Sequence, residues 1–288
     1  MANPRLKVSL NAEGDFFVDT TCIDCDACRQ LAPETFAEGD EYSYVAHQPS
    51  TPDELRDAYR ALLACPTGSI GTTGVNESAG VIGDFPIPVA EEVSYCGFNS
   101  PKSFGGNSYF IKHAAGNWLI DSPKYVRHLV RKLEEAGGVK YIFLTHRDDV
   151  ADASRYADHF GARRIIHRFE LSAQPGAEIV VEGDADIEFT PGFLIIPTFG
   201  HTRGHCCLLY RHHFLFTGDH LWWSRKRNSL NASEDVCWYS WEQQVASVAR
   251  LQGHEFAWVL PGHGERANFP PALMKTRLEE LSARLAMS

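Results

Sequence analysis

The stretch KYIFLTHRDDVAD, residues 140–152, changes abruptly from an apolar strand pattern to a run rich in histidine and aspartate. Its first half has the aromatic and β-branched composition of a buried strand. Its second half begins with His146 and carries Asp148, Asp149 and Asp152. Loops at the carboxyl ends of strands hold the chemistry of many α/β proteins, because a rigid sheet edge positions them. The stretch therefore predicts an α/β fold with a functional site at this strand end.

Three further polar motifs follow apolar stretches later in the chain. They are TFGHTRGH at 198–205, FLFTGD at 214–219 and WVLPGHG at 258–264. A single histidine at a strand end is more often an exposed polar residue than a metal ligand. Three such histidines together with an aspartate favour a metal site, because imidazole and carboxylate are the usual ligands of divalent cations.

The order and spacing of these four motifs resemble the metallo-β-lactamase superfamily. The resemblance implies an αββα sandwich over residues 91–288, with helices outside a pair of sheets. It also implies that His146, His201 and His263 are metal ligands and that Asp219 bridges two metals. Each motif is weakly specific by itself, and the specificity comes from their combination.

The first motif departs from the superfamily pattern T-H-x-H-x-D-H. Asp148 stands where a second histidine is expected, Val150 where the aspartate is expected, and Ala151 where a third histidine is expected. A two-residue insertion would align Asp152 with the superfamily aspartate, and an acidic residue there suits the dipole of the following helix. We favour that alignment, although the sequence does not separate Asp149 from Asp152. On this basis Asp152 and Asp219 are the predicted catalytic residues.

Replacing an imidazole by a carboxylate changes which metal the site prefers. Carboxylates are harder ligands and add negative charge, so the preference moves from zinc toward iron or manganese. The flavodiiron branch of the superfamily also has a carboxylate at this position and binds two irons. We expect one well-held divalent metal, and a second that is weaker or absent. The predicted ligands are His146, Asp148, His201 and Asp219 for the first metal, and Asp152, Asp219 and His263 for the second.

A separate cysteine cluster lies near the amino end, at Cys22-Ile-Asp-Cys25-Asp-Ala-Cys28 and at Cys65-Pro66. In a reducing compartment such a cluster indicates metal binding before disulfides. Structural zinc is the alternative, but zinc sites usually consist of two separated C-x-x-C pairs. The spacing resembles bacterial-type ferredoxins, whose run ends in a fourth cysteine before a proline. Ala32 replaces that cysteine here, which implies one [4Fe-4S] cluster held by Cys22, Cys25, Cys28 and Cys65.

Helix signals support this organisation. Thr51-Pro52-Asp53-Glu54 is a capping box with proline at the first helical position, and the helix after it delivers Cys65 to the cluster. Further helices are predicted from Ser122-Pro123 and from Pro270-Pro271. We predict a small α+β ferredoxin-like domain over 1–75, a linker over 76–90, and the sandwich over 91–288.

Composition limits the remaining possibilities. The chain has 288 residues, of which 44% are hydrophobic, enough for two packed domains. Its formal charge of -10 repels a phosphate backbone, so nucleic acid is not an expected partner. No apolar run approaches the roughly 20 residues that cross a bilayer, so no membrane partner is expected. The first ten residues do not resemble a secretory signal, and we expect a cytoplasmic protein.

Three functions are compatible with these features, each with a small molecule as substrate or ligand, and we favour the first of them. The first is a metal-dependent hydrolase of a thioester or lactone, since Thr202-Arg203-Gly204-His205 resembles the glyoxalase II group. The second is an oxidoreductase in which the ferredoxin domain, reduced by a redox partner, feeds electrons to a non-haem iron site. The third is a non-catalytic metal or redox sensing module.

Two local questions stay open at the level of the sequence. His205 either orients the metal site or is an ordinary core histidine. Trp222 and Trp223 either line a pocket or pack in the core.

Overall fold

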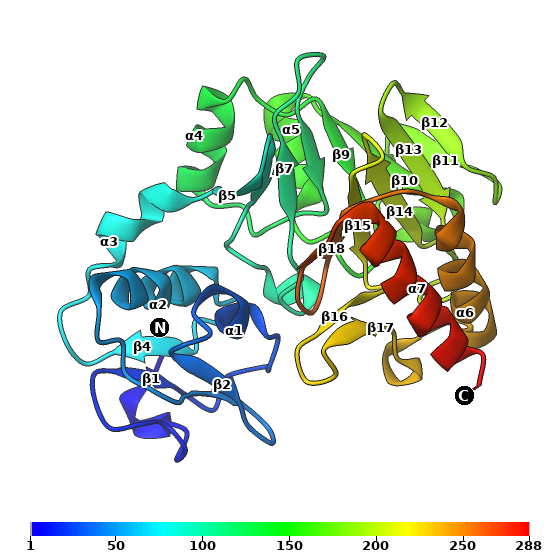
Figure 1. The fold of residues 1–288 in the computed structure, drawn as a ribbon. Helices are drawn as coiled ribbons and strands as arrows, with labels where there is room; N and C mark the ends of the chain where they lie inside the picture. The colour runs from blue at the N-terminus through cyan, green and yellow to red at the C-terminus, as the bar shows by residue number, and fades with distance from the viewer. Residues whose placement is uncertain (1, 288) are drawn as a thin grey trace.

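The computed structural model describes residues 2–287, and it divides into a small amino-terminal unit and a larger sandwich (Figure 1). In the small unit β1 pairs with β4 and β2 pairs with β3, both antiparallel. Helix α1 packs against α2. This is the small α+β unit predicted from the sequence. Its elements are β1 (Phe16–Val18), α1 (Ala27–Leu31), β2 (Phe36–Glu38), β3 (Ser43–Val45), α2 (Pro52–Ala64) and β4 (Ile70–Thr72).

Helix α2 begins at the predicted capping box. The Thr51 hydroxyl accepts a hydrogen bond from the Glu54 N–H at 3.2 Å, and the Glu54 carboxylate accepts one from the Thr51 N–H at 3.4 Å. These bonds satisfy amide groups that the first turn of a helix leaves without partners. The helix ends at Ala64, so Cys65 stands directly at its carboxyl end.

The larger unit contains two sheets. Within the described residues one has seven strands in the order β11-β10-β9-β8-β7-β6-β5, and the other six in the order β12-β13-β14-β15-β18-β19. The strands of the first are β5 (Ile87–Ala90), β6 (Val93–Tyr95), β7 (Tyr109–Ile111), β8 (Trp118–Ile120), β9 (Tyr141–Phe143), β10 (Arg163–His167) and β11 (Ile179–Val181). The strands of the second are β12 (Ile187–Thr190), β13 (Phe193–Pro197), β14 (Cys206–Tyr210), β15 (Phe214–Gly218), β18 (Trp258–Pro261) and β19 (Ala267–Asn268).

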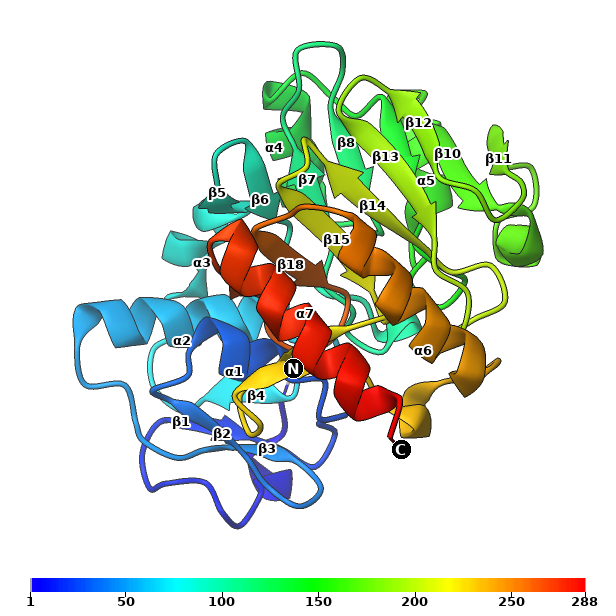
Figure 2. The same ribbon diagram turned by 45° about the vertical axis from the view of Figure 1, so that its right-hand side comes forward.

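Helices cover the outer faces of both sheets, which makes four layers. Helices α4 (Arg127–Glu135) and α5 (Ala153–Phe160) lie on the first sheet, and α6 (Trp241–Arg250) and α7 (Pro271–Leu285) lie on the second (Figure 2). Their buried apolar side chains pack into the cores beneath them. The αββα sandwich expected from the resemblance is therefore confirmed. The remaining elements are α3 (Ser78–Val81) and a hairpin of β16 (Trp222–Ser224) and β17 (Ser229–Asn231).

Two helix predictions have different outcomes. Helix α7 begins at Pro271, as predicted. Helix α4 begins at Arg127, later than the predicted start at Ser122, because the Ser122 hydroxyl donates to the Pro123 carbonyl at 3.1 Å instead of capping a helix. No helix within 2–287 is both long and apolar enough to span a bilayer.

Strand directions bring the four predicted motifs to one edge of the sandwich. Strand β15 runs parallel to β18, with Gly218 paired to Pro261, so the residues that follow both strands meet. Strand β13 is antiparallel to β14, which is antiparallel to β15, so β13 and β15 point the same way. The carboxyl ends of these strands position the residues that follow them.

The small unit is fixed against the sandwich. Ala64 of α2 is fully buried in the core of the larger unit. The Asn99 N–H donates to the Ala64 carbonyl at 3.2 Å, and the Asn107 amide donates to the Gln30 side chain at 3.3 Å. The shared core and these bonds give the two units one relative position.

The connection between the units is shorter than the predicted linker over 76–90. Strand β5 occupies the end of that range and forms the edge of the seven-stranded sheet. Asp84 accepts a hydrogen bond from Arg60 of α2 at 2.7 Å. The connection is thus held to α2 and then continues into the sheet.

Trp118 links the two sheets at the centre of the core. Its side chain is 1% exposed and stacks on Phe193 of the opposite sheet, with ring centroids 4.1 Å apart. We predict that Trp118→Ala lowers the free energy of unfolding by about 3–5 kcal/mol, because the cavity left in a packed core does not collapse fully. Urea titration followed by circular dichroism measures the change. Leu273→Ala, at a position 40% exposed, is the control and should change it by less than about 0.5 kcal/mol. Equal losses in both variants would contradict the assignment.

Candidate metal centres

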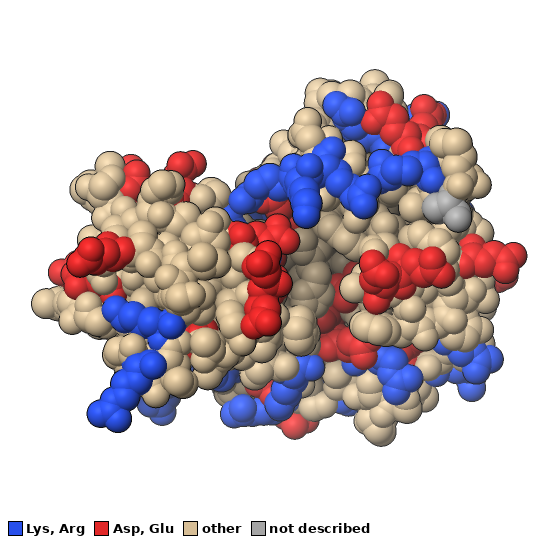
Figure 3. Space-filling view, turned by 90° about the horizontal axis from the view of Figure 1, so that it is seen from below, with Lys and Arg blue, Asp and Glu red and all other residues tan. Residues whose placement is uncertain are grey.

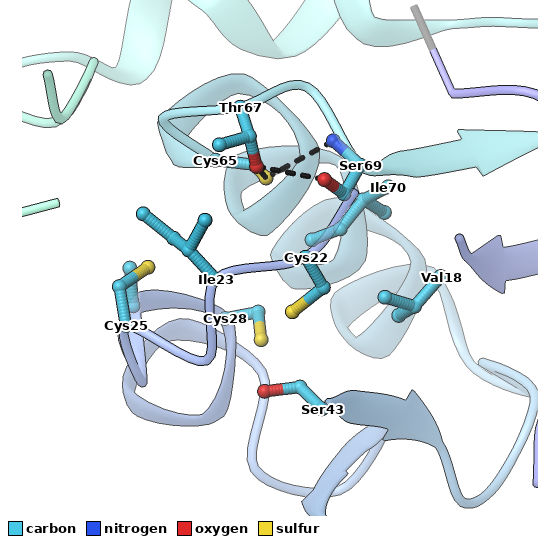
Figure 4. A pocket seen from close by; sticks show the side chains of 11 residues that line it. Val18, Cys22, Ile23, Cys25, Cys28, Ser43, Cys65, Thr67, Ser69 and Ile70 are labelled. Carbon is cyan, nitrogen blue, oxygen red and sulfur yellow. Dashed lines mark hydrogen bonds between the residues drawn. The ribbon is translucent and has the colours of Figure 1, made fainter. Parts of the chain in front are cut away.

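The four predicted cluster cysteines surround one hollow in the small unit. Cys22 and Cys25 come from the loop that leads into α1, Cys28 from the first turn of α1, and Cys65 from the carboxyl end of α2. Their sulfur atoms face the same hollow, which is also lined by Ser43, Thr67 and Ser69 (Figure 4). All four are free thiols. The structure thus brings together Cys22, Cys25, Cys28 and Cys65.

Local backbone geometry shapes this cage. Asp24 and Asp26 adopt the left-handed conformation, with φ of 53° and 67°, which turns the chain between successive cysteines. The Asp24 N–H lies 3.4 Å from the Cys22 sulfur, and the Ser69 N–H lies 3.3 Å from the Cys65 sulfur. Backbone N–H groups aimed at sulfur stabilise the negative charge of thiolate ligands and tune a cluster.

Electrostatics shows why the cage needs a positively charged occupant. Burial, together with the neighbouring Cys65 and Cys22, raises the pKa of the Cys25 thiol to about 12. Burial also raises the pKa of Cys28 and of Cys22. Thiolates are the form of cysteine that binds metal. Several thiolates can share this buried hollow only if a cationic group lies between them. Four sulfur donors around one hollow fit an iron-sulfur cluster.

We predict that Cys65→Ser lowers bound acid-labile sulfide and the visible cluster absorbance by more than half, because the cage loses a thiolate ligand. Anaerobically purified protein provides both measurements. Cys237→Ser is the matched control, since Cys237 lies outside the hollow and donates to the Gly200 carbonyl at 3.2 Å. Full cluster content in the Cys65 variant would contradict the assigned cage.

A second group of donors meets at the strand ends of the sandwich. His146 follows β9, and His201 follows β13. Asp219 and His263 follow the neighbouring strands β15 and β18. Two carboxylates close behind His146 complete the group. The six side chains are those of His146, Asp148, Asp149, His201, Asp219 and His263.

Asp219 lies at the centre of this group. Its Oδ2 atom is 3.6 Å from Nε2 of His146, 3.6 Å from Nε2 of His201 and 3.8 Å from Nε2 of His263. Asp148 Oδ2 is 3.8 Å from His146 Nε2 and 3.9 Å from His201 Nε2. These separations suit atoms arranged around a cation, and the position of Asp219 suits a carboxylate shared between two cations.

Asp149 completes the second half of the group. Its Oδ1 atom lies 3.9 Å from Nε2 of His263. The structure thus brings together His146, Asp148, His201 and Asp219, the side chains predicted to hold the first metal. The other set contains Asp149, Asp219 and His263.

Buried polar atoms without partners test whether this site fits metal ions. Within 2–287, Nε2 of His146, Nε2 of His201 and both carboxylate oxygens of Asp149 are buried and lack a hydrogen bond. The same holds for Oδ1 of Asp219. Each such atom costs about 1–3 kcal/mol if it stays unpaired. Their convergence fits divalent cations, which satisfy several donors at once.

The charges inside the site also favour bound cations. Burial disfavours the charged His146 imidazole, but the carboxylates of Asp149 and Asp219 outweigh it and raise the pKa of His146 to about 10. Burial and the neighbouring His146 lower the pKa of His201 to about 4. Burial, and then Asp219, raises the pKa of Asp149 well above its usual value. Without added positive charge these carboxylates repel one another.

Asp152, the favoured ligand from the sequence, lies outside the group. Its carboxylate accepts hydrogen bonds from Lys102 Nζ at 2.7 Å and from the Tyr125 N–H at 2.8 Å. Asp152 stands just before the first residue of α5, where the helix dipole favours an acidic side chain. This position lies away from the metal donors. Asp149, and not Asp152, lies within the group, since its Oδ1 atom is 3.9 Å from His263 Nε2.

Two glycines accommodate the Asp149 carboxylate, and they were not recognised from the sequence. A Cβ atom on Gly106 would lie 2.6 Å from Asp149 Oδ1, and one on Gly262 would lie 2.5 Å from Asp149 Oδ2. Only residues without a side chain fit at these positions. Gly262 belongs to the motif WVLPGHG, which therefore supplies space for the site as well as a histidine.

A supporting layer lies behind His146. The Thr145 hydroxyl is 3.0 Å from His146 Nδ1 and donates to Asp121 Oδ1, also at 3.0 Å. Such contacts fix which ring nitrogen faces a metal. No motif in the sequence indicates Asp121. His205 is fully buried beside this layer: its Nδ1 lies 2.9 Å from the Thr198 hydroxyl, and its ring centroid lies 5.2 Å from that of His146.

A cavity of about 1060 Å³ is lined by five of the six donors, all except the fully buried His146, and both units form its walls. Trp222 lines it, whereas Trp223 packs on Phe269 in the core. Figure 3 shows acidic side chains on both sides of a hollow in this molecule. The small unit contributes Asp24, Cys25 and Asp26 to the lining of the cavity, so one cluster ligand reaches the metal-site cavity.

Two family profiles match the chain. Residues 90–285 match the metallo-beta-lactamase superfamily, and residues 18–72 match the 4Fe-4S single cluster domain of ferredoxin I. The chain therefore belongs to the metallo-β-lactamase superfamily. It carries a single-cluster ferredoxin domain in front of the superfamily domain, and together the two domains imply an iron-sulfur cluster and divalent metals. No curated protein sequence matches the chain significantly.

Solved structures share the fold of the sandwich. The crystal structure of VMB-1 has 16% sequence identity and a TM-score of 0.51, covering 69% of this chain and 95% of that chain. A metallo-beta-lactamase family protein from Thermus thermophilus, TTHA1429, has 19% identity and a TM-score of 0.51, covering 69% and 81%. BLEG-1, a B3 metallo-beta-lactamase, has 17% identity and a TM-score of 0.52, covering 67% and 99%. At these identities the similarity concerns the fold alone.

We predict that Asp149→Asn lowers the metal content of the second centre, because an uncharged amide replaces a buried carboxylate ligand. The effect should be about a tenfold loss of affinity or more, as for other changes close to a bound metal. Metal analysis after dialysis measures it. Asp152→Asn is the matched control: it should weaken the contacts to Lys102 and Tyr125 and leave the metal content unchanged. Metal loss in the Asp152 variant alone would restore the alignment favoured from the sequence.

Proposed function

We propose that this protein is an oxidoreductase in which the ferredoxin domain, reduced by an external redox partner, feeds electrons to a non-haem iron site in the metallo-β-lactamase domain. The observation that carries the proposal is the position of Cys25. This residue lines the cluster hollow and also lines the cavity in front of the metal donors. A ferredoxin domain without a redox role would have no reason to place a predicted cluster ligand at the cavity of the metallo-β-lactamase domain.

One short segment packs against both Cys25 and Asp149. A Cβ atom on Gly105 would lie 2.8 Å from the Cys25 sulfur, and one on the next residue, Gly106, would lie 2.6 Å from Asp149 Oδ1. Two consecutive residues therefore touch a predicted cluster ligand and a predicted metal ligand. The Gly105 carbonyl accepts a hydrogen bond from the buried Asn99 amide at 2.6 Å, which holds this segment in place.

The donors of the second centre support iron. Three carboxylates and three imidazoles form a harder set than an all-histidine site, and hard oxygen ligands favour iron or manganese over zinc. Bound iron would supply one-electron chemistry, and a bound cluster would supply single electrons to it. The residues that would hold the iron are His146, Asp148, Asp149, His201, Asp219 and His263.

The rigid contact between the domains also supports electron transfer. The domains share core residues around Ala64, and the Asn99 N–H donates to its carbonyl. Electrons pass efficiently only when two centres hold a close and constant separation. A regulatory domain that moved on signalling would be expected to have a smaller and more polar contact.

Hydrolysis of a thioester or lactone, the first function considered from the sequence, uses the same six donors. A metal would polarise the substrate oxygen and generate a nucleophile from water. That function leaves the placement of Cys25 beside the cavity without a role. A sensing module without turnover likewise gives no reason for a large substrate-sized cavity at the donors.

We predict that electrons placed on the cluster reach the second centre. Anaerobic protein would be reduced with substoichiometric dithionite, and electron paramagnetic resonance would follow the cluster and the second metal separately. Signals of the second metal should change as the cluster signal decays. An unchanged second centre, together with thioester or lactone turnover, would favour the hydrolase instead.

A glycine variant tests the contact between the centres. Gly105→Ala should slow the transfer, because its Cβ would overlap Cys25 Cβ at 2.6 Å and its φ of +86° disfavours other residues. Gly253→Ala is the matched control, since nothing lies within 4 Å of its Cβ position. Cluster and metal contents measured in both variants separate slower transfer from loss of either centre. Identical rates with intact centres would contradict a role for this contact.

A further inference from the structure

Two aromatic side chains lie beside different histidines of the metal site. The ring centroid of Phe104 lies 6.4 Å from that of His263, and the ring centroid of Trp238 lies 6.3 Å from that of His201. Both aromatic residues line the cavity of about 1060 Å³. A molecule bound at the donors would therefore lie within reach of these rings.

Both rings are exposed to an unusual degree for their size. Phe104 is 60% exposed and Trp238 is 67% exposed. Leaving large apolar side chains in water forgoes the stabilisation that burial brings, about 25 cal/mol for each Å². Exposed aromatic residues beside a cavity mark a surface that a ligand covers.

The backbone holds each ring where it is. Phe104 adopts the left-handed conformation, with φ of 48°, which is uncommon for a residue with a bulky side chain. Such local strain is found where function fixes a side chain. The Trp238 N–H donates to the carbonyl of the metal ligand His201 at 2.9 Å. The backbone at Trp238 is thus bonded directly to a residue of the site, and Phe104 occupies a constrained turn at the edge of the cavity.

The charged residues around the cavity already have partners. Lys102 Nζ lies 2.7 Å from Asp152, and Arg147 Nε lies 3.9 Å from the buried carboxylate of Glu170. On the ferredoxin side, Arg29 pairs with Asp24 at 2.5 Å and with Asp26 at 2.6 Å. Apart from the metal donors, each charged group of this lining has a neighbour of opposite charge. Among the described residues that line the cavity, each basic side chain therefore has an acidic neighbour, so an anionic ligand would meet no unpaired basic side chain.

From these observations we propose that the cavity binds an uncharged, planar aromatic molecule that packs on Trp238 and Phe104 and directs an oxygen atom toward the metal donors. The proposal rests on the proposed function for the chemistry after binding, since it names the substrate class of the same site. The rings of Trp238 and Phe104 would pack on the flat faces of the ligand. Cations held by the donors would bind its oxygen atom. Because the basic side chains of the lining have acidic neighbours, they offer no binding partner for a charged substituent, and we assign an uncharged ligand.

The test uses three probes on the anaerobically purified full chain with both centres loaded. The probes are 2-naphthol, its saturated analogue decahydro-2-naphthol, and the anion 2-naphthoate. Isothermal titration calorimetry gives each dissociation constant without any reductant present. We expect 2-naphthol to bind about tenfold more tightly than the saturated analogue, since contacts with two rings favour a planar aromatic ligand. It should also bind more tightly than 2-naphthoate.

Leucine variants test the two rings without emptying the site. Trp238→Leu and Phe104→Leu keep an apolar side chain and remove the ring, and each should weaken 2-naphthol binding about fivefold. Tyr239→Leu is the matched control, because Tyr239 is 48% exposed, directly follows Trp238, and is not among the residues that line the cavity. It should leave binding unchanged. Metal analysis of each variant confirms that the donors are still loaded.

Each result decides the proposal. Equal affinity for 2-naphthol and its saturated analogue, or equal loss in the control variant, would overturn the aromatic assignment. Tighter binding of 2-naphthoate would overturn the assignment of an uncharged ligand. Because binding is measured without electron flow, failure of cluster-to-metal transfer leaves these results intact, and failure of binding leaves the transfer experiment intact.

Discussion

The larger domain depends on one constraint: negative charge gathered in a buried place must be matched by positive charge. Asp149 is fully buried, and Asp219 lies within 3.8 Å of three imidazoles. Isolated carboxylates in such surroundings are costly, and burial together with their mutual repulsion raises the pKa of Asp149. Cations shared between the donors resolve both problems at once. The strand ends, the turn after His146 and the glycines that leave room for carboxylates are arranged around this requirement.

A similar constraint operates in the smaller domain, and the two meet at one segment. Four thiols face one hollow, and burial raises the pKa of Cys25 to about 12 unless positive charge lies beside it. The backbone of Gly105 packs on Cys25 and that of Gly106 packs on Asp149, so two sites of gathered negative charge are separated by a pair of residues without side chains. Fusion of the domains in one chain, with a shared core, keeps that separation constant. This arrangement is the one that the proposed electron transfer between the two domains would need.

Much of the fold was predictable because its signals are local. The capping box at Thr51 and the apolar run before His146 each depend on a few neighbouring residues, and the structure has α2 and β9 where they indicate. The start of α4 was not predictable in the same way. Ser122 has the composition of a helix cap, but its hydroxyl bonds to the next residue, and the helix begins at Arg127. Competition between such local bonds is decided by the surroundings and not by the residue type.

The sequence by itself determined which donors exist: four cysteines at ferredoxin spacing, three histidines and Asp219 at strand ends, and carboxylates in place of the expected histidines. Only the tertiary structure decided that Asp149 and not Asp152 joins them, that Asp121 and Thr145 support His146, and that Cys25 reaches the neighbouring cavity. The physical reason is that spacing along the chain determines which residues come directly after a strand or cap a helix. The direction of a carboxylate in a short turn, and the approach of a distant glycine that leaves room for it, depend on packing between segments far apart in the chain.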